Sequence, residues 1–492
     1  MGETRTSAFF KGVSIQTVIT IILGILEILV FAIISRLLSK TDFGYFAAIT
    51  GVITIFMSIS EAGIGASIIQ KKDASKEFLS TAFTWSTIIG VIISLIILLC
   101  APLIATTIAD DTLTLPLRIM SVTILFHSII SVGNGVLYRQ LDFKKVGIIR
   151  IVSYLIASIV SIIMAMSGCG LYSIVAQPII STIISVLLLL KYVEFPKFSI
   201  YKKETKEIIS YSGWLTLGVI FNNITQQLDR LLLPRWISVE TLGAYNRPAG
   251  FVSTISMKIN GIFDTVLFPI LSDLQNDKSR VKDILLMATS LLNSFSIILF
   301  AIFFFNAELI ITIFFGEQWL DLTAILQIIS ISLIFNINGR LVDCFFRSLA
   351  YVKLGFTLRV IEACITFYSI YIGSDYGIVG VATAIVIANI MSILLKMCCL
   401  TIKTNVSFIR ILLNIFNAWK PILPLLIIGI PFLAINQHSL AIDICFAALF
   451  GSIIIIEFGF FPKYIGESYY QRVYPYVSNI KNKVIGGRFR NT

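Results

Sequence analysis

Long apolar segments recur along almost the whole chain, and they constrain the fold more than any other feature of the sequence. The chain has 492 residues, of which 57% are hydrophobic and only 13% charged, and its mean hydropathy is +0.93. A helix needs about 20 mainly apolar residues to span a membrane. These segments are apolar on nearly all faces, whereas the strands of a membrane barrel alternate. The sequence therefore predicts an all-α protein that crosses a membrane many times.

We expect about fourteen transmembrane helices. They are predicted at approximately 12–38, 43–69, 79–109, 115–138, 146–167, 170–190, 208–234, 242–272, 283–305, 321–346, 353–373, 377–402, 417–436 and 439–461. The first of these is too long for a cleavable signal peptide and contains Glu27, so we expect no signal cleavage.

Basic residues are concentrated in every second connection between these segments, and most of the 38 Lys and Arg follow this rule. Basic loops stay on the cytoplasmic side, so both termini and the loop 191–206 are predicted to be cytoplasmic. The same distribution explains the net charge of +11 without nucleic acid as a partner. The loop 191–206 mixes aromatics with lysines, which fits either a segment lying on anionic lipid or a plain linker.

The chain also repeats itself. The turn segment Ser35–Ala47 recurs after 199 positions, and a second segment around Arg139 recurs after 208. The matching pairs are Arg36 and Arg235, Ser39 and Ser238, Gly44 and Gly243, then Arg139 and Arg347, Lys145 and Lys353, and Gly147 and Gly355. One unit of about 200 residues used twice is typical of membrane transporters. We therefore expect a first lobe at 1–190, a cytoplasmic inter-lobe loop at 191–207, a second lobe at 208–402, two extra helices at 403–462 and a basic cytoplasmic tail at 463–492.

Polar residues recur at helical spacing within several apolar segments, so each set occupies one side of its helix. Ser, Thr and Asn in such stripes often bond neighbouring helices. Charged side chains are costlier to bury and normally face a bundle interior or a water-filled cavity. We therefore predict a polar lumen between two lobes. Its candidate substrate-binding residues are Glu27, Glu61, His127, Asn223, Gln226, Arg230, Asn260, Asp264, Arg340 and Asp343.

Two pairs of opposite charges stand three residues apart in the later segments. Arg340 with Asp343, and Arg359 with Glu362, can satisfy each other locally, and this pairing is the simpler interpretation for Arg359. Arg340 lies deeper in its segment, where its planar fork suits a bidentate contact with an anion. For His127, ordinary hydrogen bonding is the simpler interpretation.

No enzyme motif is present. The chain has neither a phosphate-cradling G-x-x-x-x-G-K nor an H-E-x-x-H, and its seven cysteines form no C-x-x-C pair. We expect no catalytic residues, no metal site and no cofactor. The predicted cytoplasmic loops are too short for an ATPase domain, so the energy source must be an H+ or Na+ gradient, the membrane potential or the substrate gradient.

Four stretches resemble a known family: L-L-S-K-T-D-F-G-Y-F-A from Leu37, E-A-G-I-G-A-S-I-I-Q-K-K-D from Glu61, R-Q-L-D-F-K-K from Arg139 and F-P-I-L-S-D-L from Phe268. They are similar to Wzx-type flippases, the polysaccharide-transporter branch of the multidrug/oligosaccharidyl-lipid/polysaccharide exporter superfamily. The resemblance implies a bacterial cytoplasmic membrane protein with two six-helix lobes around a central cavity. It also implies alternating access and an undecaprenyl-diphosphate-linked oligosaccharide as cargo, with a polysaccharide polymerase and chain-length machinery as partners.

Other functions remain open. Flippases of this kind often have a cationic lumen, whereas the candidates here are mixed, with Glu27, Glu61 and Asp264 as prominent as Arg230 and Arg340. An ion-coupled drug exporter of the same superfamily would normally have twelve helices. A peptidoglycan-precursor flippase would have a densely cationic lumen. A membrane polysaccharide polymerase would need larger external loops than those predicted.

Overall fold

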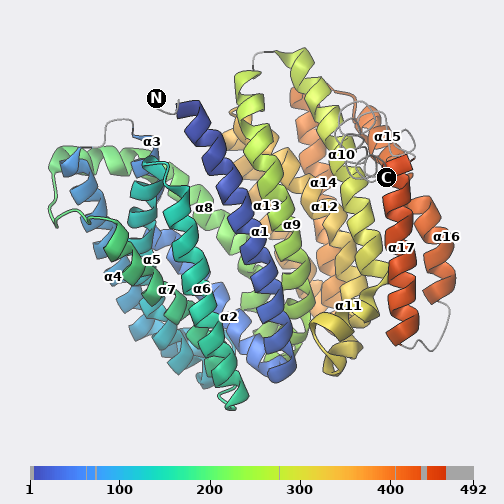
Figure 1. Ribbon diagram of the computed structural model, residues 1–492, viewed down its shortest axis with the longest axis horizontal. Coiled ribbons are helices and arrows are strands. Elements are labelled where there is room, and N and C mark those ends of the chain that lie inside the picture. The colour runs from blue at the N-terminus through green and yellow to red at the C-terminus, as the bar shows by residue number, and fades with distance from the viewer. Residues whose placement is uncertain are drawn as a thin grey trace, which may run out of the picture. The chain divides into compact units, whose positions relative to one another are not determined.

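A computed structural model describes residues 5–61, 64–71, 75–275, 277–404, 406–433 and 440–460, and in these residues every regular element is a helix (Figure 1). The α-helices are α1 (Arg5–Leu37), α2 (Lys40–Glu61), α3 (Ile64–Gln70), α4 (Lys76–Ile108), α5 (Thr114–Arg139), α6 (Phe143–Met166), α7 (Leu171–Tyr192), α8 (Lys202–Trp236), α9 (Val239–Asp273), α10 (Lys278–Phe305), α11 (Ala307–Phe314), α12 (Thr323–Ser348), α13 (Val352–Ser374), α14 (Gly377–Thr404), α15 (Phe408–Ala418), α16 (Ile422–Leu433) and α17 (Leu440–Phe460). Two 3₁₀ helices, η1 (Asp111–Leu113) and η2 (Glu317–Leu322), precede α5 and α12.

The described residues of the predicted membrane segments are largely helical, which confirms the all-helical membrane fold. Ten described helices are long and apolar enough to cross a membrane, or eleven if the pair α15 and α16, bent by 59°, forms one span. The helices α8 and α9 are not among the ten. The number fourteen therefore stays a prediction, and the predicted tail 463–492 lies outside the described residues.

Within the predicted segment 43–69, the described residues form α2 and α3, and residues 62–63 between them lie outside the described residues. The amphipathic helix α15 and the short helix α11 form in stretches that were predicted to be loops. Each is too short to span a bilayer as a single helix, since it supplies fewer than about 20 residues. A search for long apolar runs does not find elements of this kind.

Large apolar side chains are exposed on the outer faces of several helices. On α4, Leu99 is 73% exposed and Leu103 is 69% exposed, and Ile427 on α16 reaches 75%. Soluble proteins rarely leave so many large apolar side chains in water. This exposure fits contact with lipid.

The chain divides by contacts into two compact units, one comprising the residues up to Asn246 with Phe314–Gly316, the other Arg247–Ile313 and the residues from Glu317 onward. In the first unit α4 packs on α5, α6 on α7, and α2 on α8. In the second, α14 packs on both α12 and α13, and α10 packs on α12. This division places 208–246 in the first unit, whereas the sequence repeat assigned those residues to the second lobe. A repeat in sequence need not coincide with a compact unit, so the predicted lobe limits stay a prediction.

The first pair of repeated turns is built in the same way in both copies. Between α1 and α2, the Ser39 hydroxyl oxygen accepts the Asp42 N–H at 3.1 Å, and the Ser39 N–H donates to the Asp42 carboxylate at 3.1 Å. Between α8 and α9, the Ser238 hydroxyl oxygen accepts the Thr241 N–H at 3.0 Å. Serine is a strong helix cap because it satisfies an N–H group that has no partner inside the helix. The repeat predicted from Ser39 and Ser238 is therefore matched by local structure.

The second pair of turns also matches. After α5, Leu141 has φ 57° and the Asp142 N–H donates to the Leu137 carbonyl at 3.0 Å. After α12, Ala350 has φ 60° and the Tyr351 N–H donates to the Phe346 carbonyl at 2.8 Å. Both are left-handed helix ends of the Schellman type. The equivalent residues of these turns are 209 positions apart, one more than the 208 that separate the matched residues of the sequence, such as Arg139 and Arg347.

Candidate functional site

The predicted lumen residues lie on six helices. In the first unit are Glu27 on α1, Glu61 on α2, His127 on α5, and Asn223, Gln226 and Arg230 on α8. In the second unit are Asn260 and Asp264 on α9, and Arg340 and Asp343 on α12. The side chain of Asp264 lies outside the described residues, and Glu27 is half-buried.

Glu61 and His127 come together in the first unit, although each was predicted only from the stripe of its own helix. The His127 Nδ1 atom lies 2.8 Å from a Glu61 carboxylate oxygen, and the side chains are 34% and 38% exposed. The distance is that of an ion pair, although the two atoms do not form a hydrogen bond. Between two side chains that are one-third exposed, such a contact can be exchanged for one with a ligand.

Arg230 is held in place by a residue that the sequence analysis missed. Its Nε–H donates to the Asn246 amide oxygen at 3.0 Å. On the other side, a methyl group added at Gly51 of α2 would lie 3.1 Å from the Arg230 Cβ, so this glycine leaves room for the arginine. With Nε bonded to Asn246, the two terminal amino groups of the guanidinium have no protein partner among the described residues. These are the groups that bind carboxylate or phosphate in a bidentate manner.

Buried polar atoms without partners lie on the same predicted stripes. Gln227 on α8 is 8% exposed, and Ser256 and Asn260 on α9 are 3% and 5% exposed. In each, a side-chain oxygen or nitrogen has no hydrogen-bond partner in the described part of the chain. Buried polar groups in proteins are normally bonded, so such atoms need water or a ligand. Asn223 is half-buried and Gln226 is exposed, so both can contact a solute.

The structure overturns the predicted pairing of charges in the second unit. Lys396 on α14 has its ammonium 2.7 Å from a Glu362 carboxylate oxygen and 3.5 Å from an Asp343 carboxylate oxygen, and its side chain is 6% exposed. Neither Arg340–Asp343 nor Arg359–Glu362 forms an ion pair in the described structure. Both carboxylates instead point to the lysine, because α14 packs against α12 and α13 together. The only earlier signal was a lone lysine within an apolar run.

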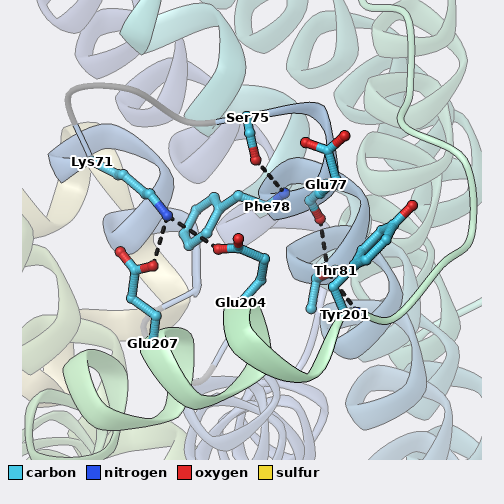
Figure 2. Close-up of polar contacts among 8 residues, drawn as sticks. All are labelled: Lys71, Ser75, Glu77, Phe78, Thr81, Tyr201, Glu204 and Glu207. Carbon is cyan, nitrogen blue, oxygen red and sulfur yellow. Dashed lines mark hydrogen bonds and ion pairs between the residues drawn. The ribbon is translucent and has the colours of Figure 1, made fainter.

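A cluster centred on Lys71, which we call the clasp, joins the segment after α3 to the start of α8 (Figure 2). The Lys71 ammonium lies 3.2 Å from the Glu204 carboxylate and 2.7 Å from the Glu207 carboxylate. It also lies 4.0 Å from the centre of the Phe78 ring, as a cation–π contact. Partial burial acts to lower the pKa of Lys71, but hydrogen bonds to Glu207 and Glu204 outweigh it, and the pKa is raised.

The inter-lobe loop is fastened to α4 beside the clasp. The Tyr201 N–H donates to the Thr81 hydroxyl at 3.2 Å, and Thr81 in turn donates to the Glu77 carbonyl at 2.8 Å (Figure 2). The Ser199 N–H donates to the Thr84 hydroxyl at 3.0 Å. Backbone groups at the end of the loop are thus hydrogen-bonded to α4.

Loops rich in basic residues and loops with few basic residues lie at opposite ends of α4. The basic loops meet at its first residues, where Lys71 contacts Glu204. At its other end the Tyr45 hydroxyl donates to the Asp110 carboxylate at 2.6 Å, which brings together two connections with few basic residues. The 33 residues of α4 separate these ends by about 50 Å, enough to cross a bilayer. The alternation of basic loops predicted from sequence thus agrees with the first unit.

A family profile described as "Polysaccharide biosynthesis protein" matches residues 33–324, well over half of the chain. The chain belongs to this family. The match begins at the end of α1 and runs through η2, so it covers the clasp, the first pair of turns and the predicted lumen residues from Glu61 to Asp264.

Two curated relatives of the family span most of the chain. The teichuronic acid biosynthesis protein TuaB of Bacillus subtilis (strain 168) is 24% identical over 341 residues, which are 68% of this chain and 71% of TuaB. The lipopolysaccharide biosynthesis protein WzxC of Escherichia coli (strain K12) is 23% identical over 407 residues, which are 80% of each chain. The predicted resemblance to Wzx-type flippases is confirmed.

Solved structures show the same fold at low sequence identity. The lipid II flippase MurJ, in an inward closed conformation, has a TM-score of 0.66 and 17% identity, with 91% of this chain and 99% of MurJ covered. A multidrug resistance transporter of the MATE family, inward-facing, also has a TM-score of 0.66, with 13% identity and 81% and 98% covered. The protein is thus a membrane protein of the polysaccharide biosynthesis family, with the fold shared by MurJ and the MATE transporter.

Proposed function

We propose that the protein carries undecaprenyl-diphosphate-linked oligosaccharide from the cytoplasmic to the outer leaflet of the bacterial cytoplasmic membrane, by alternating access. The observation that supports this cargo best is Arg230, whose guanidinium is oriented by Asn246 and keeps two amino groups for an oxyanion. The diphosphate of the lipid carrier supplies such oxyanions.

The other polar groups suit the sugar. Amides such as Asn223, Gln226 and Asn260 donate and accept hydrogen bonds, as sugar hydroxyls require. Each unit by itself has partnerless atoms that would gain bonds from a sugar: Gln227 in the first unit, and Ser256 and Asn260 in the second. The lipid-facing exterior lets the polyprenyl tail stay in the bilayer while its head crosses.

The proposal also includes the orientation of the protein in the membrane and the energy source for transport. The clasp end carries the basic loops, so we place it in the cytoplasm together with both termini. Coupling to an H+ or Na+ gradient would act through membrane carboxylates, of which Glu27 and Glu61 are the candidates. Downstream, a polysaccharide polymerase and chain-length machinery would consume the flipped repeat unit.

A deletion strain tests the cargo. Loss of the protein should abolish a surface polysaccharide and cause polyprenyl-diphosphate oligosaccharide to accumulate, as measured by mass spectrometry of extracted lipids. Arg230→Ala should fail to restore the polysaccharide, whereas Arg235→Ala, an exposed arginine on the same helix, should restore it. Unchanged surface polysaccharide with no accumulated intermediate would overturn the proposed cargo.

A further inference from the structure

The two repeated turns of the first pair lie directly against each other. Gly44 of α2 faces the backbone of Val239, and Gly243 of α9 faces the backbone of Lys40. A methyl group on Gly44 would overlap the Val239 carbonyl oxygen. A methyl group on Gly243 would overlap the Lys40 carbonyl oxygen and lie 2.7 Å from the Gly44 nitrogen. The contact is therefore reciprocal and is made by main-chain atoms.

Only glycine fits at both positions. Each glycine stands five residues after the capping serine of its own turn, 199 positions from the other, so the repeat brings equivalent surfaces together. Glycine lowers helix stability, so helix propensity does not explain its presence near the start of two helices. Close approach of two backbones does, as at the small-residue contacts of membrane helices.

The contact between Gly44 and Gly243 adjoins the residues that pack against Arg230 and orient it. Gly51 lies seven residues after Gly44, on the same face of α2, and packs against Arg230. Asn246, which orients Arg230, lies one turn after Gly243. The contact of the two turns and the packing around Arg230 therefore involve the same helices, α2, α8 and α9.

We infer that this reciprocal contact of Gly44 and Gly243 closes the external end of the transport path, and that the two turns part when the cargo leaves. The inference rests on the proposed function and orientation, since it takes these turns, which are poor in basic residues, as external. A contact between main-chain atoms suits a reversible closure, because it adds only van der Waals packing and weak C–H···O contacts.

External labelling tests the closure without measuring transport. In full-length protein whose native cysteines are replaced, Gln226→Cys reports on access from outside through its reaction with a membrane-impermeant maleimide. Gly44→Ala and Gly243→Ala should each raise that labelling about tenfold, the factor that corresponds to 1.4 kcal/mol. Gly250→Ala on α9 is the control, because nothing lies within 4 Å of a methyl group there.

Cross-linking tests the same closure with both glycines intact. Cysteines at Lys40 and Glu240, joined by a short cleavable bis-maleimide and without the Gln226 reporter, should block transport until the linker is cut. The closure is overturned if the cross-linked protein still transports, or if both glycine variants label like Gly250→Ala. If labelling rises as expected while the deletion strain accumulates no lipid-linked sugar, the closure stands and the proposed cargo fails.

Discussion

Replacing Lys396 removes the only cation that contacts the partly buried Asp343 and Glu362 carboxylates in the described part of the second unit. Its ammonium is 2.7 Å from Glu362 and 3.5 Å from Asp343, whose side chains are 25% and 19% exposed. Methionine keeps the length of the side chain and removes the charge. Breaking a buried ion pair by removing one partner costs about 3–5 kcal/mol, because the remaining charge has no compensation. With two carboxylates left beside each other, we expect Lys396→Met to destabilise the fold by an amount within this range.

The carboxylates provide the internal control. Combining Lys396→Met with Asp343→Asn and Glu362→Gln removes every charge of the cluster at similar volume, a change that is often neutral. We expect this triple variant to recover most of the lost stability. Arg340→Ala should have little effect on stability, because Arg340 makes no ion pair with Asp343 in the described structure.

Thermal unfolding of the detergent-solubilised protein, followed by size-exclusion chromatography with fluorescence detection, measures these differences. Lys396→Met should lower the midpoint by several degrees, and the triple variant should restore it. If Lys396→Met unfolds at the wild-type temperature, or if the triple variant is no more stable than the single one, the lysine does not compensate the carboxylates. A loss on Arg340→Ala as large as that on Lys396→Met would instead favour the pairing within α12.

Three further predictions concern other contacts. Lys71→Met should increase tryptic cleavage of the inter-lobe loop, and equal cleavage of the variant and the wild-type protein would contradict the role of the clasp. Because the pKa of Lys71 is raised above 10.5, the clasp should persist at neutral pH and be lost only as the pH rises through that raised value. Asn246→Ala, which frees the Arg230 guanidinium to turn, should reduce transport about tenfold, since one hydrogen bond to a charged group is worth about 1.5–3 kcal/mol. Full transport by this variant would show that Arg230 needs no positioning. Ala350→Gly should raise the unfolding midpoint, because a left-handed conformation costs a non-glycine residue about 1–2 kcal/mol, and a lower midpoint would mean that the Ala350 methyl group contributes more by packing.

The positions of the membrane helices could be predicted from sequence because an apolar run carries its own signal. The serine-capped turns could be predicted for a similar reason, since Ser39 and Ser238 each accept an N–H group three residues away. Local chemistry of this kind does not depend on what the helix packs against. By contrast, α15 was missed because one of its faces is polar, and Asn414 on that helix donates to the Leu286 carbonyl at 2.6 Å.

Contacts between helices could be predicted only in part. The stripes assigned Glu61 and His127 to polar faces of their own helices, but nothing in either stripe indicated that the two side chains would meet at 2.8 Å. The sequence repeat showed that Gly44 and Gly243 occupy equivalent positions, but equivalent positions need not be in contact. The structure adds the contact, through the carbonyl groups of Lys40 and Val239, which no side-chain pattern can reveal.

The energies of the competing ion pairs explain why Asp343 does not pair with Arg340. A pair three residues apart on one helix contributes about 0.2–0.5 kcal/mol. A lysine left without a partner inside a membrane costs at least about 2.5 kcal/mol. Lys396 is 5% exposed, so its requirement for carboxylates exceeds what either arginine gains from its neighbour on the same helix. The charged side chain with the least access to water therefore determines which ion pairs form. Asp343 and Glu362 pair with Lys396 even though each has an arginine one turn away on its own helix.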